Sequence, residues 1–363
     1  MEQEWSQSYL EISRGDLQYN ARTVANYVGR PIIGVVKCDG YGVSTAEAAA
    51  AWRSAGVTIF AVSEPEEALA LREAGFTRED ILLLTPVVSA PLLSALLEAG
   101  IILTVTGPEC ARRYAQAGAG RPVRVHVAVD TGMGRFGLRW NEIDAFRQVY
   151  QTEGLQFEGI FSHFSAAFQK SGREVHRQLE RFRFLTDALT QLGLPVGLRH
   201  IANSCAALRF PETRLDAVRI GSALVGRLPV DVPVSLRPVG LCRAMVVDCK
   251  TLRRGDTTGY AALCRVRKDT RVAIVSLGHQ SGFGLVKQPQ SFRLRDLLRQ
   301  QCHLLRTFRQ QPVVWYQGKA LPVVGRIGTQ FTLVDVGDSG LACGEYVSAN
   351  VDMMLPPPHR RYV

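Results

Sequence analysis

A lysine ends the first strongly apolar run of the chain, and a Gly-Tyr-Gly turn follows it, in the stretch GVVKCDGYGVS at residues 34–44. A lysine at the inner end of a buried strand costs several kcal/mol of desolvation unless its ammonium is paired, neutralised or used covalently. A lysine amine can condense with an aldehyde to an imine, which removes the buried charge and uses the nitrogen in catalysis. Lys37 is therefore the first candidate for a catalytic residue.

The elements around Lys37 alternate between short apolar runs and longer segments of helical period, from residue 30 to about residue 226. Apolar strands separated by helices predict a parallel sheet that is covered on both faces. Eight such units in roughly 200 residues predict a (β/α)8 barrel, the TIM-barrel fold. A doubly wound open sheet is the main competitor, but its usual glycine fingerprint after the first strand is absent. The expected strands are residues 32–37, 58–63, 81–86, 101–106, 123–130, 157–164, 198–204 and 217–226.

Several polar residues follow the ends of these strands, which is where functional residues gather in such barrels. Ser204, Gly221 and Ser222 belong to the last two strands, where barrels commonly bind phosphate through hydroxyl and main-chain N–H groups. Taken alone, Ser204 fits better as the N-cap of a helix over CAALRF. The full set at the strand ends is Lys37, Arg135, His163, His200, Asn203, Ser204, Arg219, Gly221 and Ser222.

A lysine at one strand end and a phosphate site at another suggest a phosphorylated aldehyde held between them. Pyridoxal 5'-phosphate (PLP) carries both groups, and its imine with Lys37 would account for the buried lysine. No metal is expected, because the eight cysteines lie far apart and show neither CxxC nor Cys/His ligand spacing. PLP is therefore the expected cofactor.

A second domain begins where the alternation of strands and helices stops, between Leu228 and Gly240. Strand-like pieces separated by glycine-containing turns follow, as in an antiparallel β domain. We therefore expect a PLP-binding barrel domain at residues 1–235 and a mainly antiparallel β domain at residues 236–363. Residues 291–310 differ, because their leucines and arginines have near-helical spacing. This basic amphipathic helix fits packing across its own domain better than contact with a partner or a membrane.

Composition and charge limit the partners of the protein. The formal net charge is +10, but the arginines are scattered and no motif that reads nucleic acid accompanies them, so anionic small molecules explain the charge as well. No apolar run is long enough to cross a membrane, and the acidic, polar N-terminus is unlike a signal peptide. These features indicate a cytoplasmic enzyme or binding protein that acts on a small molecule, without nucleic acid or membrane partners.

Seven segments in order resemble the successive motifs of the alanine racemases: VVKCDGYG, VDTGMGRFGL, GIFSHF, RHIANSCAAL, AVRIGSALVG, GDTTGYAA and VVGRIGTQFTLVDV. The similarity runs from about residue 6 to residue 340. It implies a fold-type III PLP enzyme, in which a barrel is followed by a β domain and two chains form a head-to-tail homodimer. It also implies an isomerase that interconverts L- and D-alanine.

The resemblance implies roles for individual residues. Lys37 would bind PLP covalently and act as one of two bases, and Tyr260 would be the other, reaching the partner's barrel. Arg219 would face the pyridine nitrogen as a weak proton donor, which favours racemisation over transamination. Tyr41, Ser204, Gly221 and Ser222 would hold the phosphate, Asn203 would lie beside them, His163 would lie beneath the ring, and Arg135 would orient Tyr260 or the substrate carboxylate.

The chain departs from the family pattern at the substrate mouth. Ala128 stands where the family carries a lysine that is often carbamylated, so that a bound anion such as chloride is a possible substitute. Thr329 and Gln330 replace a Met-Asp pair, which makes Thr329 a candidate substrate-binding residue beside Arg135. His279 and Phe168 replace a tyrosine and an acidic residue at the entrance. The alternatives to alanine racemisation are therefore a PLP-dependent racemase or related enzyme of another amino acid such as serine, and a PLP-binding homologue without catalysis.

Overall fold

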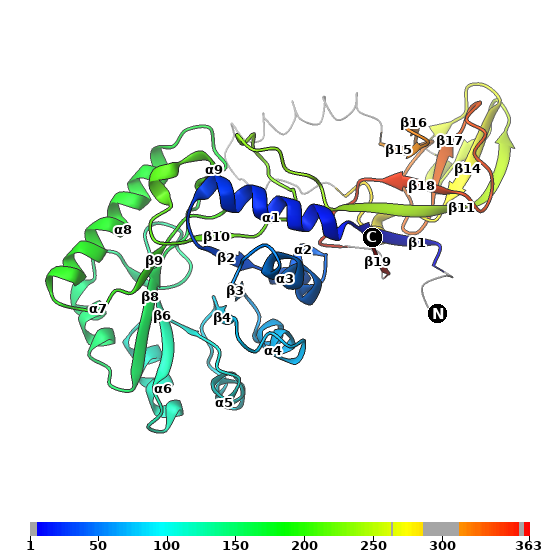
Figure 1. Cartoon of the computed structure of the whole chain (residues 1–363). Helices are drawn as coiled ribbons and strands as arrows, with labels where there is room; N and C mark the ends of the chain where they lie inside the picture. The colour runs from blue at the N-terminus through cyan, green and yellow to red at the C-terminus, as the bar shows by residue number, and fades with distance from the viewer. Residues whose placement is uncertain (1–5, 263, 286–311, 356–358) are drawn as a thin grey trace. The chain divides into compact units, whose positions relative to one another are not determined.

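The computed structural model describes residues 6–262, 264–285, 312–355 and 359–363. The chain divides into two units, Arg14–Val239 and the combination of Met1–Ser13 with Gly240–Val363 (Figure 1). The expected basic helix at residues 291–310 lies outside the described residues. Among the helices that are described, none has the length and apolar character needed to cross a membrane.

Eight parallel strands form the centre of the Arg14–Val239 unit. Ladders join β10, β2, β3 and β4 in one arc and β5, β6, β8 and β9 in another. Two parallel bridges, from Leu82 to Ile102 and from His200 to Ala217, connect the arcs at both ends and close the ring. The predicted (β/α)8 barrel is confirmed. Its strands are β2 (Ile32–Val35), β3 (Ile59–Val62), β4 (Asp80–Leu83), β5 (Leu103–Val105), β6 (Val123–Asp130), β8 (Leu155–Phe161), β9 (Leu198–His200) and β10 (Val218–Ile220); the two-residue β7 (Leu138–Arg139) pairs with the end of β6.

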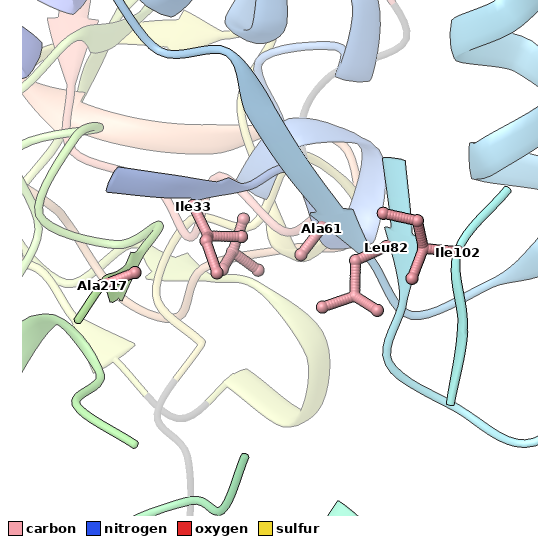
Figure 2. Close-up of a cluster of buried hydrophobic side chains, with 6 residues drawn as sticks. Ile33, Ala61, Leu82, Ile102 and Ala217 are labelled. Carbon is pink, nitrogen blue, oxygen red and sulfur yellow. The ribbon is translucent and has the colours of Figure 1, made fainter. Parts of the chain in front are cut away.

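A layer of apolar side chains supports one side of the barrel (Figure 2). Its members come from neighbouring parallel strands and from the bridges beside them, and each is at most 7% exposed: Ile33, Val35, Ala61, Leu82, Ile102 and Ala217. The continuous apolar runs in the sequence follow from this position, because such strands face the barrel interior on one side and helices on the other. The layer holds the strand ends, and therefore the residues that follow them, at fixed positions.

Helices follow most of the barrel strands and cover them from outside (Figure 1). The longest buries Val175, Leu179 and Phe182 at intervals of three or four residues, which is the spacing of one helix face. The first helix is tied to the end of the unit by the buried Asn20, whose amide bonds the main chain of Leu224 and Arg237. The helices are α1 (Arg14–Val28), α2 (Lys37–Tyr41), α3 (Thr45–Arg53), α4 (Pro65–Glu73), α5 (Ala90–Glu98), α6 (Pro108–Gly118), α7 (Ile143–Tyr150), α8 (Arg173–Gln191) and α9 (Ser204–Arg209).

The second unit is built on one long strand, β11 (Gly240–Leu252), which pairs antiparallel with β1, β14 and β18. Residues that are buried alternate with partly exposed ones along its first half, as in a sheet with one covered face. The predicted mainly antiparallel β domain is confirmed, with a parallel pair between β1 and β19 as the exception. The other strands are β1 (Ser8–Ile12), β12 (Thr257–Thr258), β13 (Cys264–Arg265), β14 (Thr270–Val275), β15 (Val313–Tyr316), β16 (Lys319–Pro322), β17 (Thr332–Asp335), β18 (Tyr346–Ala349) and β19 (Arg360–Tyr362).

The strand at residues 8–12 pairs with β11, although the sequence assigns it to the barrel domain at residues 1–235. Five residues that alternate between buried and partly exposed carry no information about which sheet they join. The pairing of β1 with β11 joins residues more than 200 positions apart, so it depends on packing between distant parts of the chain. The division of the chain at residues 235 and 236 stays a prediction.

Candidate active site

A cavity of about 460 Å³ in the Arg14–Val239 unit is lined by residues at the carboxyl ends of the barrel strands. Nine of the residues singled out in the sequence line it: Lys37, Tyr41, Arg135, His163, Asn203, Ser204, Arg219, Gly221 and Ser222. They come from five separate segments of the chain. The barrel therefore brings together cations, hydroxyl groups and an imidazole that are up to 185 residues apart in sequence (37 to 222).

Lys37 opens a tight left-handed turn that begins one residue beyond the end of β2. Cys38, Asp39 and Gly40 have φ values of 55°, 51° and 63°, a conformation that costs about 1–2 kcal/mol for each residue with a Cβ. Glu67 on α4 stabilises the turn, because its Oε1 accepts the N–H of Asp39 at 3.2 Å. The turn lets Lys37 and Tyr41, four positions apart, face the same cavity.

Tyr41, Ser204 and Gly221 form the part of the cavity suited to an anion. The Oγ of Ser204 accepts the N–H groups of Gly221 at 3.2 Å and Ala223 at 3.4 Å. Burial, followed by the negative charges near it, raises the pKa of Tyr41 well above its ordinary value. Its hydroxyl therefore keeps its proton and can donate a hydrogen bond to a phosphate oxygen.

Asn203, rather than Ser204, is the N-cap of α9. Its Oδ1 accepts the N–H of Ala206 at 3.1 Å, and its Nδ2 donates to the carbonyl of Phe164 at 3.4 Å. Ser204 is thereby free of the capping role and bonds the loop after β10 instead. The capping role that the sequence suggested for Ser204 therefore belongs to Asn203, and the role at the anion site stays with Ser204.

His163 is bonded to the buried guanidinium of Arg219, whose Nη2 lies 3.1 Å from its Nδ1. Because arginine has no acceptor, Nδ1 must accept, and the proton of the neutral ring must sit on Nε2. Burial first, and then the charges of Arg219, Arg135 and Lys37, lower the pKa of His163 to about 3. His163 is therefore a neutral ring at physiological pH.

Arg219 is 4% exposed, and burial lowers its pKa to about 9, with the charge of Arg135 as a smaller cause. Its terminal nitrogens donate to Nδ1 and the carbonyl of His200, to the carbonyl of Ser162 and to Nδ1 of His163. These four bonds use the four terminal N–H groups. Within the described residues, Nε–H is the guanidinium donor left without an acceptor.

Arg135 sits on a loop that is shaped by one carboxylate. The Oδ1 of Asp130 accepts the N–H groups of Gly132, Met133 and Gly134 at 2.8, 2.9 and 3.0 Å. The exposed guanidinium of Arg135 lies 5.5 Å from the ring of Phe136 and has no hydrogen bond or ion pair within the described part of the chain. It is available to a carboxylate. Ala128, at the family's lysine position, lines the same cavity.

Tyr260 and Thr329 belong to the other unit. The main chain of Tyr260 begins the short helix η2 (Tyr260–Ala262), and the placement of its side chain is not described. The carbonyl of Thr329 accepts the N–H of Gln280 at 2.9 Å, and the N–H of His279 donates to the carbonyl of Gly328 at 3.0 Å. The departures at His279, Thr329 and Gln330 therefore lie on two loops that are bonded to each other.

Two buried histidines join the site that sequence reasoning left without a role. His200 was placed among the strand ends only, and His126 was not singled out. His126 lies inside β6, two residues before Ala128, and period-two alternation puts both side chains on the same side of the strand. The two-residue spacing between His126 and the cavity residue Ala128 is the signal that could have identified His126.

The family model for the alanine racemase N-terminal domain matches residues 12–229, and the model for the alanine racemase C-terminal domain matches residues 240–351. The chain belongs to the alanine racemase family. An alanine racemase of Desulforamulus reducens is 32% identical over 339 residues, which cover 91% of this chain and 85% of that protein. Another, of Desulfosudis oleivorans, is 32% identical over 327 residues, or 84% of this chain and 77% of that one. The solved alanine racemase of Streptomyces coelicolor A3(2) has a TM-score of 0.84 at 26% identity and covers 98% of both chains. The resemblance stated from sequence is confirmed.

The residues of this alanine racemase cavity fit PLP. A Cβ at Gly221 would fall 2.5 Å from Cε2 of Tyr41, so that only glycine leaves room for the tyrosine ring at this wall. The protonated hydroxyl of Tyr41 suits a phosphate, and the unaccepted Nε–H of Arg219 suits a ring nitrogen that accepts a hydrogen bond. No group of three or more His, Cys, Asp or Glu side chains that could bind a metal occurs among residues 6–262, 264–285, 312–355 and 359–363.

Proposed function

We propose that the protein is a PLP-dependent racemase that interconverts L- and D-alanine. The observation that supports this most directly is the single cavity shared by Lys37, Tyr41, Ser204 and Arg219, in a chain of the alanine racemase family. The proposal includes a PLP-binding barrel domain at residues 1–235, a β domain at residues 236–363, a cytoplasmic homodimer and a small amino acid as substrate.

The phosphate end of PLP would be held by Tyr41, Ser204, Gly221 and Ser222, with Asn203 capping the helix beside them. Tyr41 would donate from its protonated hydroxyl, and Ser222 would donate from its main-chain N–H, since the N–H groups of Gly221 and Ala223 are bonded to Oγ of Ser204. Lys37 would provide the covalent link, and His163 would lie against the ring as a neutral imidazole. When bound, PLP withdraws electrons from the amino acid and makes its Cα–H acidic.

Two residues would then move the proton at Cα. Inversion requires removal on one face and return on the other, so the two groups must lie on opposite sides. Lys37 Nζ would serve one face, and Oη of the partner's Tyr260 would serve the other. This requirement for a second chain is the reason for proposing a homodimer.

Arg219 and Arg135 would set the charge around the substrate. Arg219 keeps its proton at neutral pH, since its pKa of about 9 remains above 7, and it would donate only a hydrogen bond from Nε. A donor this weak would leave little charge on the PLP ring, which would favour rapid return of the proton to Cα. Arg135, which has no carboxylate partner within the described residues, would bind the substrate carboxylate, and Thr329 would contribute to the same region.

The test combines the cofactor and the reaction. The purified wild-type chain should be yellow, and borohydride should fix PLP on the peptide that contains Lys37; Lys37→Ala should bind PLP without this covalent product. A panel of L- and D-amino acids in deuterated water should show Cα–H exchange with alanine. A colourless protein that stays so after PLP is added would refute the proposal. Exchange with serine and not with alanine would change the substrate but keep the racemase.

A further inference from the structure

A chain of hydrogen bonds between buried side chains runs from Arg219 into the barrel, away from the residues already assigned. Nη1 of Arg219 lies 2.8 Å from Nδ1 of His200, and Nε2 of His200 lies 2.9 Å from Nδ1 of His126. Arg219, His200 and His126 are 4%, 0% and 4% exposed. These three hydrogen-bonded side chains are therefore almost completely shielded from solvent.

The direction of each hydrogen bond in this series follows from Arg219, the donor at which the series begins. Arginine can only donate, so Nδ1 of His200 accepts and Nε2 of the same neutral ring carries the proton. That Nε2–H must donate to His126, whose Nδ1 accepts and whose proton sits on Nε2. Burial and the charge of Arg219 lower the pKa of both histidines, to about 3 for His126, so both rings are neutral. One tautomer of each ring satisfies the whole chain.

A glycine makes this contact possible. His126 on β6 and His200 on β9 stand on either side of β8, and His126 is paired in register with Gly159 on that strand. A Cβ at position 159 would fall 2.6 Å from Cε1 and 2.7 Å from Nδ1 of His126. The absence of a side chain at Gly159 therefore leaves the space through which the two imidazoles meet.

The consequence for Arg219 lies in which of its donors stay free. If His200 lost its acceptor at His126, its proton could move to Nδ1 and oppose the N–H of Arg219 there. The guanidinium would then lose one of its four anchoring bonds and could rotate. Its Nε–H would no longer be held as the free donor at the cavity.

We propose that His126 is a positioning residue for the racemase reaction: through His200 it fixes the guanidinium of Arg219 so that Nε–H stays available to the pyridine nitrogen of PLP. This inference rests on the proposed function. It assigns a role to a residue that lies two hydrogen bonds from the cavity residue Arg219.

The test compares His126→Leu, which removes the acceptor, with His126→Asn, whose amide oxygen can accept near the position of Nδ1. In the apoprotein, ¹⁵N NMR should show His200 of the wild type and of His126→Asn protonated at Nε2 alone. His126→Leu should show both tautomers of His200 and a shifted Arg219 Nε–H signal. With PLP and alanine, His126→Leu should lower kcat about tenfold with KM within about twofold, and shift the visible absorption band, while His126→Asn restores both.

The outcomes separate the two proposals. If His126→Leu leaves the His200 tautomer, the Arg219 signal and kcat unchanged, the positioning role is wrong. A loss of kcat in both variants with unchanged NMR signals also overturns it, since that pattern reports packing alone. If His126→Leu does not fold, His126→Gln replaces it, because its longer side chain displaces the acceptor. A wild type that binds no PLP would refute the proposed function and this inference together, whereas a PLP-binding wild type with silent variants refutes the inference alone.

Discussion

The ring of Tyr41 occupies the space beside Gly221 in which any other residue would place its Cβ, at 2.5 Å from Cε2. Real carbon atoms without a bond do not approach so closely, and the half-buried Tyr41 ring would have to move to make room. We therefore expect Gly221→Ala to displace the Tyr41 hydroxyl and to weaken PLP binding about tenfold or more, as for loss of one charge-assisted hydrogen bond. Titration of the apoprotein with PLP, followed by absorbance, measures the change.

Gly107→Ala is the matched control. Its backbone is extended, and an added Cβ there would meet only Cδ2 of Leu138 at 3.6 Å, an ordinary contact. PLP affinity should stay at the wild-type value. Equal weakening by the two substitutions would mean that the Tyr41 contact is not the cause.

Glu67 connects α4 to the turn that carries Lys37. One carboxylate oxygen accepts the N–H of Asp39, and the other accepts the N–H groups of Ser63 and Glu64, all at 3.2 Å. Glu67→Ala removes both acceptor oxygens and all three hydrogen bonds, and the left-handed turn keeps its strain without this support. We expect a loss of about 1–3 kcal/mol of stability in urea unfolding and slower covalent trapping of PLP by borohydride.

The neighbouring Glu66→Ala serves as the control, because Glu66 is exposed and lies on the same first turn of α4. It removes one charge near the helix N-terminus but no contact with the turn. Its trapping rate should match the wild type. A Glu67→Ala protein that traps PLP at the wild-type rate would show that the turn holds Lys37 without the carboxylate.

The barrel could be predicted from sequence because its signals are local. A strand such as β2 is buried at every position, which requires a continuous apolar run, and each run is followed by a helix with its own period. The residues at the strand ends then follow from the topology of the fold. The sequence therefore predicts Lys37 and Arg219 as residues of one site, and both line the cavity.

The remaining features depend on contacts between distant positions. The pairing of β1 with β11 joins residues more than 200 positions apart, and the His126–His200 contact needs a glycine on a third strand. Nothing within β6 alone marks His126 as different from a buried strand histidine. The role of Tyr260 came only from the family resemblance, because a tyrosine in a turn has no pattern of its own.

The histidine chain predicts how stability depends on pH. The pKa of His126 is lowered to about 3 in the folded protein, while an unfolded histidine has a pKa of about 6.5. Between these values the unfolded state binds a proton that the folded state does not, so stability is present above about pH 6.5 and is lost as pH falls. Each such histidine contributes about 1.4 kcal/mol per pH unit in the middle of this window.

We therefore expect the unfolding free energy of the apoprotein to fall more steeply as pH drops from about 5.5 to about 4 in the wild type than in His126→Asn. The difference between the two slopes should be about 1.4 kcal/mol per pH unit, which corresponds to one proton. Urea unfolding at a series of pH values gives both slopes. The carboxylates titrate in both proteins and cancel in the comparison. Equal slopes would mean that His126 takes up its proton while the protein is still folded.

Tyr260→Phe tests the two-base arrangement. Removal of one hydroxyl leaves Lys37 able to exchange the proton on its own face but removes the donor on the other face. We expect interconversion of L- and D-alanine to fall about 100-fold or more, which is the usual contribution of one general acid or base. In deuterated water, Cα–H exchange without inversion should persist for one enantiomer only, as followed by proton NMR. Tyr316→Phe is the control, because it removes a hydroxyl of the same unit that donates to Glu345 at 2.7 Å. Both enantiomers exchanging at wild-type rates in Tyr260→Phe would require another group on the second face, and His279 or Thr329 would then be the residues to change next.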